Sequence, residues 1–223
     1  MSIMQSSEEK PMYFIPSLDY FNKSTNETTE ISEKIKLRNY KQKNDNFINE
    51  YSIVSYKKEC LVTNTSFNDT LQHGPIIKDC DGECYLGNLR SVIFNENQEL
   101  VSFTPPKSVN YNDFTSNYPL NYENIVVEQF IEGTMISLFY NHAYKENDDE
   151  TGKWEIATKS FVGANNHFFK VDGNPMSFKE MFYDIWNKKN LKFDDLFSRD
   201  TCYTFVIQHP ENRIVTKIFK PCI

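Results

Sequence analysis

The sequence predicts an α+β fold dominated by antiparallel strands. Short runs of alternating or β-branched residues recur from residue 51 to the C-terminal part of the chain, and turn residues separate them. One amphipathic helix stands among them, over residues 178–186. Of the 223 residues, 39% are hydrophobic and 15% aromatic, which is enough for a packed core in one sizeable domain.

Composition narrows the classes of partner and the compartment. A net charge of -7 argues against broad coating of nucleic acid, although it leaves room for a local basic cleft. We expect no membrane partner, because no apolar run is long enough to span a bilayer. The N-terminus lacks a secretory pattern and the five cysteines are an odd number, so we expect reduced thiols and a cytoplasmic location.

Residues 1–50 are predicted to be an N-terminal appendage, and residues 51–223 the main domain. The stretch 22–30 is polar and without period, so we expect a mobile loop there. Residues 31–46 are strongly charged and favour a marginal, exposed helix.

The first strands of the main domain are predicted from alternation and turn signals. Residues 51–56 alternate and indicate one strand. Residues 89–94 and 99–103 flank the polar turn 95–98 and predict a hairpin. Two prolines directly after it end the ladder, because proline supplies no N–H.

Further strands are predicted in the second half, including two on either side of the Glu132-Gly133 turn. They cover residues 125–129, 134–140, 154–160, 203–208 and 214–219. The second and third form a long hairpin around an acidic tip.

The predicted helix has both a start signal and an apolar face. Ser177 and Glu180 have the spacing of a capping box. The residues that recur on one face are apolar, and we expect them to be core: Phe178, Met181, Phe182, Ile185 and Trp186.

Several residues have the chemistry that attack on a nucleotide α-phosphate requires. Such a site needs an activated lysine, further cations around the triphosphate, a small residue for close backbone approach and carboxylates for Mg²⁺. The candidates are Arg90, Lys107, Glu132, Gly133, Lys159 and Arg213. Any one of them alone is more often a solvated surface residue; their order gives them weight.

That order resembles the adenylyltransferase domain of phage-type ATP-dependent RNA ligases, in the covalent nucleotidyltransferase superfamily. The resemblance covers roughly residues 85–220, and similar Glu-Gly-Thr-Met-Ile sequences occur in uncharacterised proteins of giant DNA viruses, whose site of action would be the host cytoplasm. Five blocks carry it: residues 89–94, 101–107, 127–136, 154–160 and 203–215.

The resemblance implies a ligase-type, antiparallel-sheet nucleotidyltransferase core, unrelated to the ATP-grasp fold, with ATP and Mg²⁺ held between sheets. Arg90, Lys107 and Lys159 would line the phosphate and substrate side, and Phe205 the nucleobase side. Glu132 and Gly133 would form the turn beside the nucleotide.

Departures from the family pattern concern catalysis. Phe130 occupies the position of the nucleophilic lysine, and no lysine occurs anywhere in residues 108–144. Ser91 and Ser160 replace family glycines, and Val206 replaces an acidic residue. The later metal and triphosphate motifs do not occur before residue 223, so we expect a core truncated at the C-terminus.

Three functions stay open at this point. The first is a catalytically inactive, RNA-ligase-like domain that retains nucleotide or RNA binding. The second is an active ligase that uses an unrecognised lysine, with Lys107 as first suspect, or a separate C-terminal piece. The third is a structural scaffold that binds a protein partner. A zinc site at Cys80 and Cys84 is a weaker alternative, since two more ligands are needed.

Overall fold

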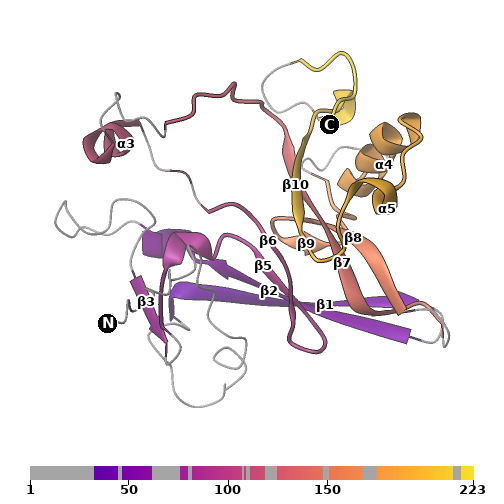
Figure 1. Cartoon of the computed structure of the whole chain (residues 1–223), viewed down its shortest axis with the longest axis horizontal. Coiled ribbons are helices and arrows are strands. Elements are labelled where there is room, and N and C mark those ends of the chain that lie inside the picture. The colour runs from indigo at the N-terminus through magenta and orange to yellow at the C-terminus, as the bar shows by residue number, and fades with distance from the viewer. Residues whose placement is uncertain are drawn as a thin grey trace, which may run out of the picture.

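The computed structural model describes residues 33–44, 47–61, 76–79, 82–106, 108, 111–118, 125–147, 151–167, 175–212 and 217–223. Two four-stranded antiparallel sheets pack against each other, and a helix covers the outer face of the second (Figure 1). The predicted α+β class with antiparallel sheets is therefore confirmed.

The first sheet has the strand order β1-β2-β5-β6. Its strands are β1 (Ile35–Asn44), β2 (Phe47–Tyr56), β5 (Val92–Asn95) and β6 (Leu100–Phe103). The helix expected over residues 31–46 is wrong, because β1 pairs with β2 along its whole length, from Ile35 opposite Tyr56 to Asn44 opposite Phe47. This pairing outweighs the local charge pattern, and the boundary predicted at residue 50 falls inside β2.

The second sheet has the order β10-β7-β8-β9. Its strands are β7 (Thr134–Lys145), β8 (Thr151–Thr158), β9 (Phe161–Val162) and β10 (Tyr203–Ile207). The predicted hairpin and the late strand are thus confirmed.

The strand expected over residues 125–129 is wrong. Residues 125–132 run without strand pairing into β7, whose two edges are already occupied by β10 and β8. Of the strand expected over 214–219, residues 217–219 are not in a strand, and the rest lies outside the described residues.

The core between the sheets combines apolar packing with a polar link. Tyr51 and Ile53 of β2 pack against Phe139 of β7 and Ala157 of β8. The buried Asn141 amide donates to the Tyr51 hydroxyl at 3.0 Å and ties the two sheets together. A buried hydrogen bond of this kind fixes the position of one sheet relative to the other, because a shift would leave buried polar atoms unpaired.

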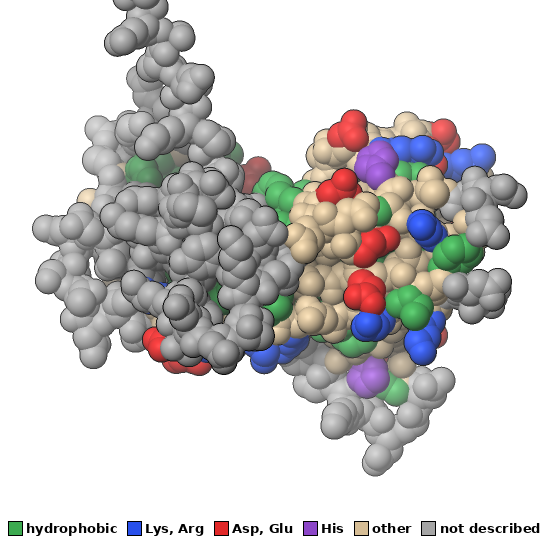
Figure 2. Space-filling model, turned by 90° about the horizontal axis from the view of Figure 1, so that it is seen from below, with side chains coloured by type: hydrophobic (Ala, Val, Ile, Leu, Met, Phe, Trp, Pro, Cys, Tyr) green, Lys and Arg blue, Asp and Glu red, His purple; other side chains and the backbone are tan. Residues whose placement is uncertain are grey.

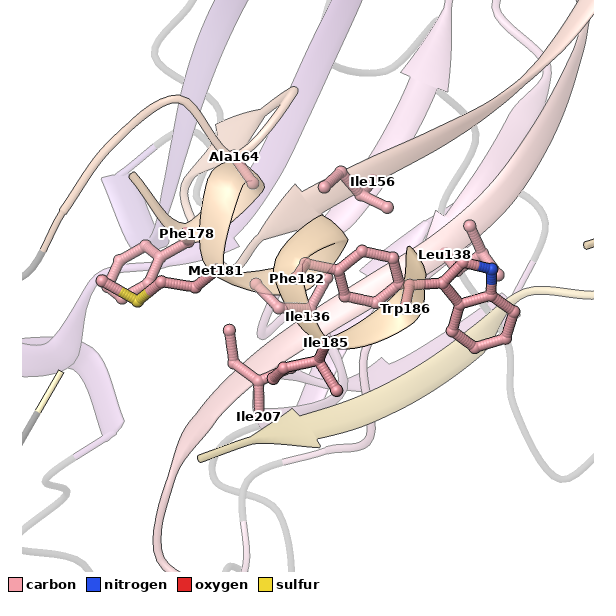
Figure 3. Close-up of a cluster of buried hydrophobic side chains, with 10 residues drawn as sticks. All are labelled: Ile136, Leu138, Ile156, Ala164, Phe178, Met181, Phe182, Ile185, Trp186 and Ile207. Carbon is pink, nitrogen blue, oxygen red and sulfur yellow. The ribbon is translucent and has the colours of Figure 1, made fainter. Parts of the chain in front are cut away.

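The outer face of the second sheet is covered by α4 (Phe178–Lys188) and α5 (Phe193–Leu196). Ser177 caps α4 as predicted: its hydroxyl accepts from the Glu180 N–H, and the Glu180 carboxylate accepts from the Ser177 N–H at 2.6 Å. All five predicted apolar residues of α4 are buried. Figure 3 shows them lying over Ile136, Leu138, Ile156 and Ile207 of the sheet.

The remaining elements are short. They are η1 (Lys58–Leu61), β3 (Ile76–Asp79), β4 (Gly82–Tyr85), η2 (Leu86–Asn88), α3 (Tyr111–Asn117) and η3 (Pro210–Asn212). The η2 turn matters for the site, because Leu86 and Leu89 pack under the first sheet beside Tyr56 and Val92. That packing fixes the chain on the N-terminal side of β5.

Candidate anion site

Three cationic side chains are near enough to interact electrostatically where β8 ends. Lys159 follows β8, Arg90 precedes β5, and Lys58 lies in η1. Burial lowers the pKa of the half-buried Lys159, and the positive charges of Arg90 and Lys58 lower it further. We call these three residues the cation cluster. Its members come from both sheets and lie far apart in sequence.

None of the three forms an ion pair with a carboxylate among the described residues. Four other described lysines and arginines do: Lys41, Lys153, Lys188 and Arg199. Like charges held together without a counter-charge repel one another, so an anion bound among them would relieve that repulsion.

Packing fixes the backbone that carries the cluster. The Lys159 ammonium lies 4.9 Å from the ring centroid of the buried Tyr56, a cation–π contact. The carbonyl of Ser160 accepts hydrogen bonds from the guanidinium of Arg38, at 3.2 Å, and from the hydroxyl of Tyr40. The turn after β8 is thereby tied to β1.

Backbone hydrogen bonds hold the two residues that flank Arg90. The Tyr56 N–H donates to the Leu89 carbonyl at 2.7 Å, and the Thr104 N–H donates to the Ser91 carbonyl at 3.0 Å. The guanidinium is a planar, permanently charged group that can donate two parallel hydrogen bonds to one phosphate. Its placement beside Lys159 therefore suits a phosphate or carboxylate ligand.

Phe130, where the resemblance leads us to expect a nucleophilic lysine, lies in solvent. Phe130 is 92% exposed, and Val127 in the same segment is 91% exposed. A phenyl ring cannot form a bond to phosphorus, and the segment provides no buried environment that would activate a nucleophile.

The space beside the Gly133 Cα is filled by residues of β10. A Cβ at this residue would lie 2.5 Å from the Ile207 carbonyl oxygen and 2.7 Å from Cγ1 of Val206. The Gln208 amide donates to the neighbouring Glu132 carbonyl at 2.8 Å. The close backbone approach expected at this turn is thus made by β10.

Phe205 is separated from the cation cluster. It lies on the α4 side of the second sheet, with ring centroids 6.0 Å from Phe182 and 6.2 Å from Trp186. Of the six residues predicted to hold a nucleotide, the structure brings together Arg90 and Lys159. Lys107 lies outside the described residues, as does Arg213.

Sequence reasoning missed two charged residues. Lys58 has no motif around it, so no local signal marks it. Glu155 is different: it occupies an inward-facing position of β8 beside apolar Ile156 and Ala157, and it is only 7% exposed. In an alternating strand, a charged residue at a position that should face the core is unusual. The alternation in the sequence could therefore have identified Glu155.

One face of the molecule carries charges of both signs. On the face that Figure 2 shows, acidic and basic side chains are interspersed, and neither sign forms a continuous area outside the grey atoms. Within the described ranges, no three His, Cys, Asp or Glu side chains are grouped to hold a metal ion. The cysteine pair 80/84 falls outside this search: Cys80 is not described, nor is the Cys84 side chain.

The helices of the described residues include none long and apolar enough to cross a membrane. Comparisons with protein-family models, with curated proteins and with solved structures find no match.

Proposed function

We propose that the chain is an RNA-ligase-like nucleotidyltransferase domain that has lost covalent catalysis and retains a phosphate-binding site for a nucleotide or RNA. The cation cluster of Lys58, Arg90 and Lys159 carries the proposal. Two of its residues, Arg90 and Lys159, are on the phosphate side by the resemblance, and the proposal is supported by the effect of the Arg90 charge on the pKa of Lys159.

The chemistry of the cluster supports phosphate over a carboxylate ligand. Three cations match the charge of a polyphosphate or of successive RNA phosphates better than the single charge of a carboxylate. The ring of Tyr56 beside Lys159 keeps the ammonium partly out of water, which strengthens its pairing with an anion.

The loss of catalysis rests on Phe130. The ligase reaction begins with attack by a lysine amine on the α-phosphorus, and loss of a covalent nucleophile leaves at most a small residue of activity. A second lysine in the same site would be needed to restore it.

Lys159 favours a second candidate function, covalent nucleotidyl transfer through a different lysine. Its lowered pKa increases the neutral, nucleophilic form of the amine. In that reaction the Lys159 nitrogen would bond to the α-phosphorus of ATP, the bond to the β-phosphate oxygen would break, pyrophosphate would leave, and the nitrogen would lose a proton to solvent. ATP and Mg²⁺ are the ligands to supply, as the resemblance implies.

The test is incubation of the full chain with α-labelled ATP and Mg²⁺, followed by denaturing electrophoresis. The proposal expects no labelled protein. A labelled adduct that disappears in Lys159→Ala and persists in Lys188→Ala would overturn it in favour of the second candidate. Calorimetry with ATP and with a 5′-phosphorylated RNA oligomer completes the test: no heat from either ligand would favour a scaffold.

A further inference from the structure

A cleft lies between β1, the β8–β9 edge and α4, apart from the cation cluster. Its volume is about 440 Å³, within the range of small-molecule sites. It shares no lining residue with the cation cluster. Whatever binds in this cleft therefore does not depend on the function proposed above.

The buried residue Glu155 contributes to the lining of the cleft. Its Oε2 accepts from the Gln42 amide at 3.1 Å, the one side-chain hydrogen bond to Glu155 among the described residues. Burial raises the pKa of Glu155, while the Gln42 hydrogen bond and the charges of Lys153 and Lys179 lower it. A carboxylate has room for about four donors, so most of its accepting capacity is unused.

A glycine lets two amide side chains converge beside that carboxylate. Gly163 has φ +83°, and a Cβ there would lie 3.1 Å from Gln42 Nε2 and 3.4 Å from Asn165 Nδ2. Both amides line the cleft. The cleft thus offers a carboxylate and two amides close to one another.

The rim of the cleft is cationic and its walls are aromatic. The rim lysines are Lys41, Lys43, Lys153 and Lys179, and the aromatic lining includes Tyr40, Phe161 and Tyr183. Lys41 and Lys153 are paired with Glu50 and Glu146. Lys43 and Lys179 form no ion pair among the described residues.

These features restrict the ligand. Lys43 and Lys179, the two rim lysines without an ion pair among the described residues, disfavour a cationic ligand. The donors that face Glu155 therefore belong to a neutral group, and an anionic group faces the rim. Aromatic walls suit a flat ring between those two ends. A nucleotide whose base carries adjacent N–H donors has this arrangement.

We propose that this cleft binds a guanine nucleotide, with the base against Glu155 and the phosphate at Lys43 and Lys179. Guanine presents two parallel donors, N1–H and N2–H, to one carboxylate. Adenine and cytosine place a ring acceptor beside their amino group, which a carboxylate repels, and uracil has a single donor between two acceptors.

The experiment is calorimetric titration of the full chain with GMP, AMP, CMP and UMP. GMP is expected to bind about 5- to 150-fold more tightly than the others, the range for one good bidentate contact to a base. Guanosine without phosphate is expected to bind more weakly than GMP, and Lys179→Ala is expected to reduce that difference, because Lys43 alone then remains at the phosphate.

Variants distinguish the cleft from the cation cluster. Glu155→Gln is expected to abolish the preference for GMP, and Asn165→Ala, an exposed change that leaves the core intact, is expected to weaken GMP. Lys188→Ala, an exposed residue of α4 that does not line the cleft, is the matched control and is expected to leave GMP binding unchanged. Equal affinity for all four nucleotides, no binding of GMP, or loss of binding in Lys159→Ala with Glu155→Gln unaffected would each overturn the proposal. A thermal melt of each variant confirms that it is folded.

Discussion

Replacing Gly133 by alanine tests whether β10 or a ligand requires glycine at the turn before β7. The added Cβ would lie 2.5 Å from the Ile207 carbonyl oxygen, where ordinary contact begins at 3.4 Å. The turn and β10 must therefore separate by about 0.9 Å at this point. A backbone carbonyl in a paired strand cannot rotate away as a side chain can.

The separation also strains two hydrogen bonds that close the same end of the sheet. The Gln208 amide donates to the Glu132 carbonyl at 2.8 Å, and the Asn212 amide donates to the Thr134 hydroxyl at 2.6 Å. Overpacking costs about 1–3 kcal/mol and the two weakened hydrogen bonds together about 1 kcal/mol, so Gly133→Ala should lower the free energy of unfolding by about 2–4 kcal/mol. For a chain of this length that is a fall in Tm of roughly 4–16 °C.

The assay is thermal unfolding followed by circular dichroism, with Val206→Ala as the matched control. Val206→Ala removes the Cγ1 atom that the new Cβ would meet at 2.7 Å, from a side chain that is 38% exposed, and should cost less than about 1 kcal/mol. The double variant should recover only part of the loss, because the Ile207 carbonyl remains. An unchanged Tm in Gly133→Ala, together with lost ATP binding, would refute this reasoning and return Gly133 to the ligand.

Three further predictions concern charge and burial. Glu155→Gln should raise Tm at pH 7, because burial raises the pKa of Glu155 and the ionised carboxylate therefore destabilises the folded state. The gain in Tm should shrink as the pH falls toward that raised pKa, and a lower Tm at pH 7 would contradict this. Arg90→Gln should raise the pKa of Lys159, because it removes one of the two positive charges that lower this pKa. NMR titration of the ¹³C-dimethylated Lys159 amine measures the pKa, and an unchanged value would show that Arg90 and Lys159 do not interact. Ser91→Ala should raise the free energy of unfolding by about 1 kcal/mol in denaturant titration, because the buried Ser91 hydroxyl has no hydrogen-bond partner among the described residues; a loss of stability would contradict this.

The elements that the sequence predicted correctly are those whose signals are local. The capping box at Ser177 and the 3.6-residue period behind it needed no knowledge of the rest of the chain. The β7–β8 hairpin likewise joins neighbours along the chain. The exact strand ends were less well predicted, as for β5, which begins at Val92 rather than at Leu89.

The errors arise where distant residues decide. The charged segment of β1 is a strand because β2 supplies a partner for each residue, which the charge pattern of the segment does not reveal. Residues 125–129 have strand-like composition, but they pair with no strand among the described residues, and both edges of β7, the strand that follows them, are occupied by β10 and β8. Composition gives a segment its tendency to form a strand, and pairing with distant segments decides whether it becomes one.

The candidate site was predictable only in part for the same reason. Arg90 and Lys159 could be named from their sequence blocks, but Lys58 enters the site only because η1 follows β2. Phe205 could be placed on a strand but not on a face. It packs into the aromatic cluster under α4, away from the cations.

The most direct test of the cation cluster is the salt dependence of RNA binding. A 5′-phosphorylated single-stranded oligomer is titrated into the wild-type chain, the triple variant Lys58→Ala/Arg90→Ala/Lys159→Ala, and the control Lys188→Ala at several salt concentrations. Each phosphate contact contributes about 0.7 to the slope of log K against log salt, so the triple variant should lose affinity and about 2 units of slope, with the control unchanged. Equal slopes in the wild-type chain and the triple variant would contradict the account, because the three cations would then not contact the RNA.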